Sequence, residues 1–92
     1  MSQLQRTVQP DPDVVDTEID ADELALLHLG TKTYFSLNRT GARIWHDLRQ
    51  GLSLETISLR LQEEFDVDAE QAQRSVQRLV DDLAQHSLTR HV

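Results

Sequence analysis

The sequence predicts an α+β fold in which a three-stranded antiparallel meander is followed by three helices, in the manner of a winged helix-turn-helix. Two observations predict this order. The first half of the chain contains short runs in which apolar and polar side chains alternate, which is the period of a half-buried strand. The second half repeats apolar residues at the spacing of an amphipathic helix. The short connections favour direct packing of consecutive elements.

Three strands are expected in the first half, at residues 14–19, 24–29 and 33–37. Short segments rich in Asp, Gly and Thr separate them and predict tight turns. In the third strand, alternation places Phe35 and Leu37 on one face and Tyr34 and Ser36 on the other. Short loops also make the middle run the central strand, so the first and third strands are predicted to be the edges of the sheet.

Three helices are expected after residue 37, because a capping residue stands before each apolar stripe. Asn38, Ser53 and Asp68 are suitable N-caps, and Gly51 is suited to end the first helix. The third helix is expected to end near residues 86–88. The stripes predict a core between one face of the sheet and the helices, built from Ile44, Trp45, Leu48, Leu54, Ile57, Leu61, Phe65, Ala72, Val76, Leu79, Val80 and Leu83.

Length and composition restrict the class of protein. The 92 residues suffice for one domain, expected at residues 14–90, and the polar, proline-containing residues 1–13 are expected to be a disordered N-terminal tail. The absence of cysteine excludes disulfides, thiolate nucleophiles and cysteine zinc sites. We find no signal-peptide pattern and no apolar run of the roughly 20 residues that a membrane span needs. A cytoplasmic location without membrane contact is expected.

Catalytic and metal-binding residue types lack the spacing that their chemistry needs. The histidines at 28, 46, 86 and 91 form no helical pair, and His28 on an apolar strand is expected to be structural. The serines lack a nucleophile-elbow context. Asp81 and Asp82 are adjacent on a helix and therefore point in different directions. We expect no enzymatic activity, cofactor or metal. The formal net charge of −7 also disfavours nucleic-acid binding.

The run from Leu24 to Trp45 resembles the PqqD-like family of peptide-binding proteins. The similarity is greatest in Tyr34–Asn38 (YFSLN) and Thr40–Trp45 (TGARIW). The later stretches Leu52–Phe65 and Val67–Leu88 match the family's two remaining helices in length and order, and the similarity as a whole covers roughly residues 14–90. The resemblance implies a recognition element that acts as a peptide chaperone. Such a protein binds the leader segment of a ribosomally made precursor peptide destined for modification. Gly30–Thr33 replaces a Pro-Glu-Gly-like stretch of the pyrroloquinoline quinone member, and the chain looks nearer to lasso-peptide proteins.

In this family the leader adds a strand to the edge of the third strand and lies in the cleft against the third helix. Carried over to this chain, the implied peptide-binding residues are Lys32, Thr33, Tyr34, Phe35, Ser36, Leu37, Arg74, Ser75, Arg78, Leu79 and Asp82. The cations at 32, 74 and 78 predict a basic groove that suits an acidic leader. In the alternative interpretation, the arginines only keep an exposed face soluble.

The implied partners are a precursor leader peptide and a modifying enzyme of the leader peptidase, cyclase or radical SAM type. The chain itself is expected to be a monomer or a weak dimer. Two other functions stay open at this point. A winged helix can be a DNA-binding regulator, and an open sheet edge can serve as a protein–protein or dimerisation module.

Overall fold

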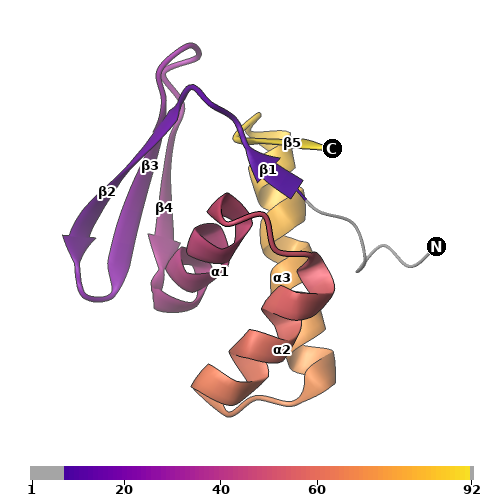
Figure 1. Cartoon of the computed structure of the whole chain (residues 1–92). Helices are drawn as coiled ribbons and strands as arrows, with labels where there is room; N and C mark the ends of the chain where they lie inside the picture. The colour runs from indigo at the N-terminus through magenta and orange to yellow at the C-terminus, as the bar shows by residue number, and fades with distance from the viewer. Residues whose placement is uncertain (1–7, 92) are drawn as a thin grey trace.

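The computed structural model describes residues 8–91 and confirms the predicted fold class. Three antiparallel strands form a sheet in which β3 is central, and β2 and β4 are the edges (Figure 1). Three helices follow the sheet in the chain. The elements are β2 (Val14–Asp20), β3 (Glu23–His28), β4 (Tyr34–Asn38), α1 (Arg39–Arg49), α2 (Leu54–Phe65) and α3 (Ala69–Gln85).

Each helix begins at its predicted cap. The side chains of Asn38, Ser53 and Asp68 each accept a hydrogen bond from the backbone N–H three residues further on, which satisfies a donor that the helix leaves unpaired. Gly51, with a φ of +80°, follows the end of α1 in a conformation that glycine adopts without strain. None of the helices in the described part of the chain is long and apolar enough to cross a membrane.

The core is organised around α1. This helix packs against β3 and β4 on one side and against α2 on another, whereas α3 packs mainly on α2 (Figure 1). Trp45 is almost completely buried, and its indole N–H donates to Asp16 on β2 at 2.9 Å. The predicted apolar stripes all contribute to this core, with Phe65 and Leu79 only half-buried at its margin.

A second sheet of two strands was not predicted. β1 (Val8–Pro10) pairs antiparallel with β5 (Thr89–His91), so that the two ends of the described chain lie together (Figure 1). Val8 is 0 % exposed and belongs to the core. The prediction of a disordered tail is therefore wrong for residues 8–13, and its remaining part, residues 1–7, lies outside the described residues. The same pairing extends the ordered chain beyond the predicted boundaries of 14–90.

Val8→Ala tests the role of β1 in the fold. Because the valine side chain is fully buried, its truncation is expected to lower the free energy of unfolding by about 2 kcal/mol. Val15→Ala is the matched control, since Val15 is 43 % exposed and the same change should cost less than about 0.5 kcal/mol there. Urea unfolding followed by the fluorescence of the single tryptophan, Trp45, measures both. Equal stabilities of the two variants would contradict the burial of Val8.

Candidate functional site

The two edges of the main sheet differ in how they are protected. β2 carries Asp16, Glu18 and Asp20, and its register shifts between Glu18 and Asp20 as at a β-bulge. Charges and bulges are the features by which proteins prevent edge strands from pairing with other chains. β4 has the sequence YFSLN, without charge, and pairs with β3 in an unbroken register. The β4 edge is therefore the one that can accept another strand.

The hydrogen bonds at the start of β4 show which of its backbone groups face that edge. The N–H of His28 donates to the carbonyl oxygen of Thr33 at 2.9 Å, so Thr33 faces β3. In an antiparallel strand, alternate residues direct their N–H and C=O groups to the same side. Phe35 therefore also faces β3, and Tyr34 and Ser36 direct their N–H and C=O groups to the free edge.

A cleft runs between the end of β4 and α3. One hollow of about 280 Å³ is shared by the last residue of β4, the first turns of α1 and the middle of α3. A second hollow of about 400 Å³ continues along α3 towards its first turn, and Ser75 and Arg78 line both. We call the first hollow the β4–α3 cleft. Its lining residues are Asn38, Thr40, Gly41, Ile44, Ser75, Arg78, Leu79 and Asp82.

Gly41 brings the first turn of α1 close to the end of β4. Its backbone N–H donates to the Asn38 side chain at 2.9 Å. A Cβ atom at this position would lie 3.3 Å from the Leu37 side chain, which is tighter than ordinary van der Waals contact. Glycine at this position therefore lets the first turn of α1, which lines the cleft, pack directly against the end of β4. Sequence reasoning did not assign Asn38, Thr40, Gly41 or Ile44 to the site, although the family-like motif contains all four.

The residues that the sequence predicted for the site fall into two groups: those of α3 line the two hollows, whereas those of β4 and of the turn before it line neither. On the strand side, Tyr34 is 62 % exposed, Phe35 is half-buried and Leu37 is buried, as alternation predicted. Lys32 and Thr33 belong to the turn before β4, with Lys32 in a left-handed conformation (φ 62°). On the helix side, all five predicted residues line one of the two hollows, namely Arg74, Ser75, Arg78, Leu79 and Asp82.

The charges along α3 do not form the predicted basic groove. Arg74 is paired with Glu70 at 2.9 Å, and Asp68 and Glu70 line the same hollow as the two arginines. Arg78 makes no ion pair with any described residue, and Asp82 lies one turn further along the same wall. The prediction of a basic groove is therefore wrong, because acids of α3 itself balance its arginines.

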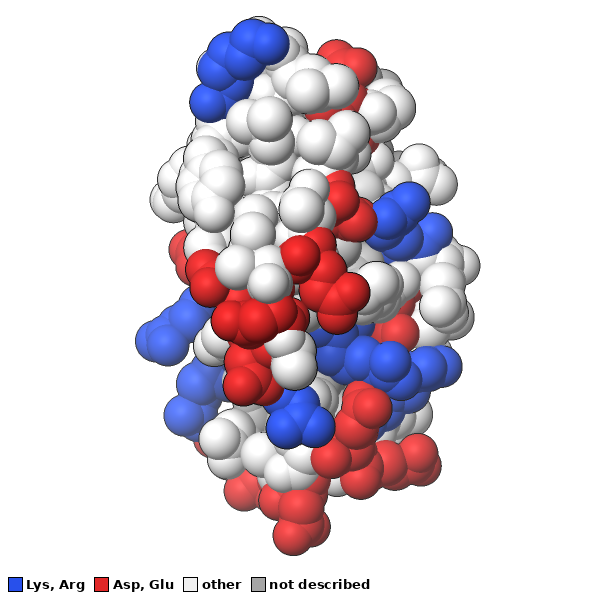
Figure 2. Space-filling model, turned by 90° about the vertical axis from the view of Figure 1, so that its left-hand side faces the viewer, with Lys and Arg blue, Asp and Glu red and all other residues white. Residues whose placement is uncertain are grey.

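Acidic side chains also gather at the end of the sheet formed by the β2–β3 turn (Figure 2). Asp20, Asp22 and Glu23 line a shallow hollow together with Ser36, Leu37 and Asn38 of β4. Glu23 accepts a hydrogen bond from the hydroxyl of Ser36 at 2.6 Å. A peptide along β4 would therefore meet negative charge at the Asn38 end and the cation of Arg78 across the cleft.

The side chains of Asp11, Asp13 and His28 place possible metal-binding atoms within 4.8 Å of one another. His28 is 7 % exposed, and its Nδ1 accepts hydrogen bonds from the N–H groups of Gly30 and Thr31 at 3.1 Å each. The ring proton is therefore assigned to Nε2, which lies 3.7 Å from Asp11 Oδ1. A protonated Nε2 is not a metal ligand. These contacts fit the predicted structural histidine.

Comparison with known proteins assigns this chain to a family. A model of the family described as coenzyme PQQ synthesis protein D (PqqD) matches residues 23–88, which is more than half of the chain. The protein belongs to the PqqD family. No match was found among curated proteins.

Two solved structures resemble this PqqD-family chain over nearly its whole length. One is TbiB1 in complex with the TbiA(beta) leader peptide, with 37 % sequence identity, a TM-score of 0.81, and coverage of 88 % of this chain and 93 % of that one. The other is a lasso peptide synthetase B1 complexed with the leader peptide, with 25 % identity, a TM-score of 0.81, and coverage of 90 % and 96 %.

Proline substitutions in β4 test the assignment of its two sides. Phe35→Pro removes an N–H that faces β3 and is expected to lower the free energy of unfolding by about 2 kcal/mol or more. Tyr34→Pro removes an N–H that faces the free edge, so a loss below about 1 kcal/mol is expected. Urea unfolding of both variants measures the difference. A larger loss of stability for Tyr34→Pro than for Phe35→Pro would show that the N–H of Tyr34, and not that of Phe35, faces β3.

Proposed function

We propose that this PqqD-family protein binds the leader segment of a ribosomally made precursor peptide by strand addition to β4. The observation that carries the proposal is the uncharged, unbulged β4 edge next to a cleft walled by α3. In strand addition, main-chain hydrogen bonds provide affinity and side-chain pockets fix the register. The N–H and C=O groups of Tyr34 and Ser36 would supply the hydrogen bonds, and Leu79 and Ile44 the apolar part of the pocket.

The two solved relatives support a leader peptide as the ligand. Each is described as a complex with a leader peptide, and each matches this chain with a TM-score of 0.81. The identity of 37 % with TbiB1 extends over 88 % of this chain. A lasso-type precursor is accordingly the substrate class that we propose, with the residues predicted from the sequence together with Asn38, Thr40, Gly41 and Ile44 as the binding site.

The protein would act by presentation rather than by catalysis. A bound leader tethers the remainder of the precursor and raises its local concentration near a modifying enzyme, such as a leader peptidase, a cyclase or a radical SAM enzyme. Strand addition leaves the outer face of the sheet uncovered. There Val15, Leu27 and Tyr34 form a cross-strand apolar row, in which Val15 and Tyr34 are exposed. Such a row offers the enzyme a surface that ends at the bound peptide.

The alternative of a DNA-binding winged helix receives less support. The helix that would enter the major groove, α3, carries Glu70, Asp81 and Asp82. Phosphate contacts supply most of the affinity for DNA and need cations. Of the arginines on α3, Arg74 is already paired with Glu70. Dimerisation through β4 would use the same edge as the peptide, so a bound leader would compete with it.

Binding of a labelled leader, measured by fluorescence anisotropy, tests the proposal. The probe is the leader of any small precursor gene found beside this protein's own gene. The wild-type chain is expected to bind it saturably, and a labelled DNA duplex not at all. Tyr34→Pro should remain folded but lose most of the affinity, because one edge N–H is missing and the proline ring obstructs the added strand. Val15→Ala, on the other edge strand, should bind like the wild type. Unchanged leader binding by Tyr34→Pro would refute strand addition at β4.

Arg78→Gln tests the cation of the β4–α3 cleft, which makes no ion pair with any described residue. The substitution is expected to weaken the binding of an acidic leader roughly threefold and to make binding less dependent on salt, since charges at the rim of an interface contribute modestly to affinity. Gln73→Glu is the matched control, because it lowers the net charge by the same one unit at an exposed position of α3 that lines neither hollow. Equal affinities of the two variants would exclude a role for Arg78 in reading the leader.

A further inference from the structure

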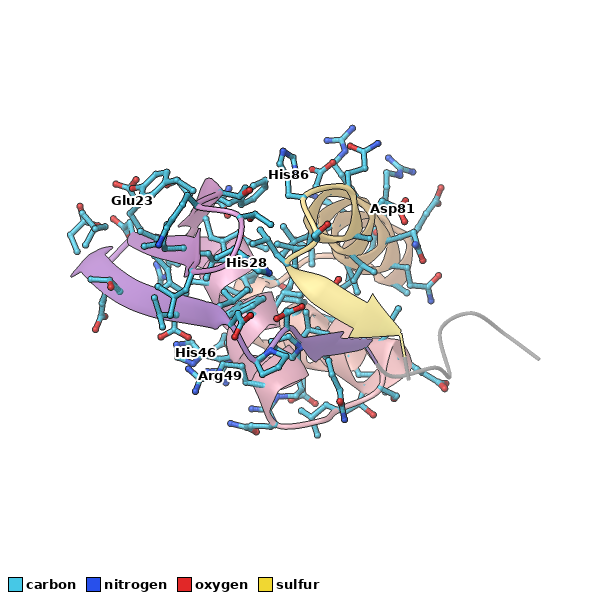
Figure 3. The ribbon with its side chains drawn as sticks, turned by 90° about the horizontal axis from the view of Figure 1, so that it is seen from above. Glu23, His28, His46, Arg49, Asp81 and His86 are labelled. Atoms are coloured by element: carbon cyan, nitrogen blue, oxygen red, sulfur yellow. The ribbon has the colours of Figure 1, made fainter. Side chains whose placement is uncertain are left out.

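The β4–α3 cleft needs α3 at a fixed distance from β4, yet these two elements have little direct packing. α3 packs mainly against α2 and β5. The ring contact between the two walls joins Phe35 of β4 to His86 at the end of α3, with the ring centres 5.1 Å apart. His86 is exposed (Figure 3), and its Nδ1 is hydrogen-bonded to the carbonyl oxygen of Asp82 at 2.8 Å. Besides the shared core, any further connection between the end of α3 and the sheet therefore bears on the width of the cleft.

Asp11–Asp13 supply such a connection, because they bind the segment after α3 on one side and the β3 end of the main sheet on the other. The N–H of Asp11 donates to the carbonyl oxygen of Leu88, just beyond α3, at 3.0 Å. Two residues later, the carbonyl oxygen of Asp13 accepts from the N–H of Leu29, at the end of β3, at 2.9 Å. The carboxylate of Asp11 also lies 3.7 Å from Nε2 of His28 on β3. Figure 3 shows His28 between the sheet and the β1–β5 pair.

The segment is also held in shape and anchored at its start. The Asp11 carboxylate accepts a hydrogen bond from the N–H of Asp13 at 2.9 Å, and the Asp11 carbonyl oxygen accepts one from the N–H of Val14 at 3.0 Å. Val8 is fully buried, and β1 pairs with β5 directly after the end of α3. Leu88, whose carbonyl oxygen receives Asp11, is itself fully buried.

We propose that residues 8–13 form a strap that sets the width of the β4–α3 cleft, and that Asp11 and His28 are positioning residues for peptide binding. The proposal rests on the proposed function for its ligand, but the strap itself is a property of the free protein. A strand added to β4 lies about 4.8 Å from it, so α3 must stand at a matching distance to contact the added side chains. If the strap is weakened, the correct width is populated for only part of the time, and the apparent affinity falls by that fraction.

Asp11→Ala tests this, with Asp81→Ala as its matched control. Each aspartate accepts a hydrogen bond at 2.9 Å, Asp11 from the N–H of Asp13 and Asp81 from the side-chain amide of Gln77, but Asp81 is an exposed residue of α3 that lines neither hollow and lies outside the strap. The chain has no cysteine, so Thr17→Cys on β2 and Ala84→Cys on α3, both exposed positions, can carry two spin labels without other changes. Double electron–electron resonance then measures the separation of sheet and α3. Leader affinity is measured separately on unlabelled protein.

The expected result is one narrow distance for the wild type and Asp81→Ala, and a broadened distribution for Asp11→Ala with leader binding about tenfold weaker. If Asp11→Ala does not fold, as judged by circular dichroism, Asp11→Asn decides, because it keeps the oxygen that accepts from Asp13 and removes the charge beside His28. A narrow, unchanged distance in the folded variant overturns the strap. So does a broadened distance with unchanged leader affinity. A broadened distance together with a wild type that binds no leader would retain the strap and reject the proposed function instead.

Discussion

The N–H and C=O groups of Tyr34 and Ser36, which pair with no other strand among the described residues, are the constraint on which the rest of this structure depends. Backbone groups of this kind must be satisfied by water or by another chain. An exposed edge strand therefore carries a risk of unwanted pairing, which proteins usually reduce with charges and bulges. Here the β2 edge has both features and the β4 edge has neither. The difference has a simple explanation if β4 is kept open for a ligand.

The remaining elements place a second wall beside that edge without covering it. α1 fills the inner face of the sheet through Ile44 and Trp45, and Gly41 lets its first turn approach the end of β4. α3 is attached to α2 and to β5 rather than to β4, which leaves the cleft between them. The charges of the cleft are mixed, so the open edge and the apolar floor would contribute more to peptide affinity than net electrostatic attraction would.

The sequence predicted the features that are encoded locally. Asn38, Ser53 and Asp68 are capping residues whose signal lies within one helical turn, and alternation alone assigned Tyr34 and Phe35 to opposite faces. The resemblance to the PqqD family added the expectation that β4 and α3 together form the binding cleft, to which no local pattern points. It also contained the Thr40–Trp45 motif, whose first residues line the cleft, but the role of Gly41 depends on its distance to Leu37.

The features that the sequence missed are non-local. β1 and β5 have three residues each, which is too short for a period, and they are joined only by the fold of the whole domain. The loss of the basic groove likewise depends on geometry, since the pairing of Arg74 with Glu70 and the position of Asp82 beside Arg78 became evident only in three dimensions. The cytoplasmic location and the absence of catalytic activity stay predictions.

Amide hydrogen exchange of β4, with and without bound leader, tests the central claim most directly. In the free protein the N–H groups of Tyr34 and Ser36 are open to water, whereas Phe35 and Leu37 face β3. Saturation with the leader is expected to slow exchange at Tyr34 and Ser36 strongly, because both amides would enter a new ladder of hydrogen bonds. The amides of the β2 edge should keep their rates. Leader binding that leaves Tyr34 and Ser36 exchanging as before, or that protects β2 instead, would contradict strand addition to β4.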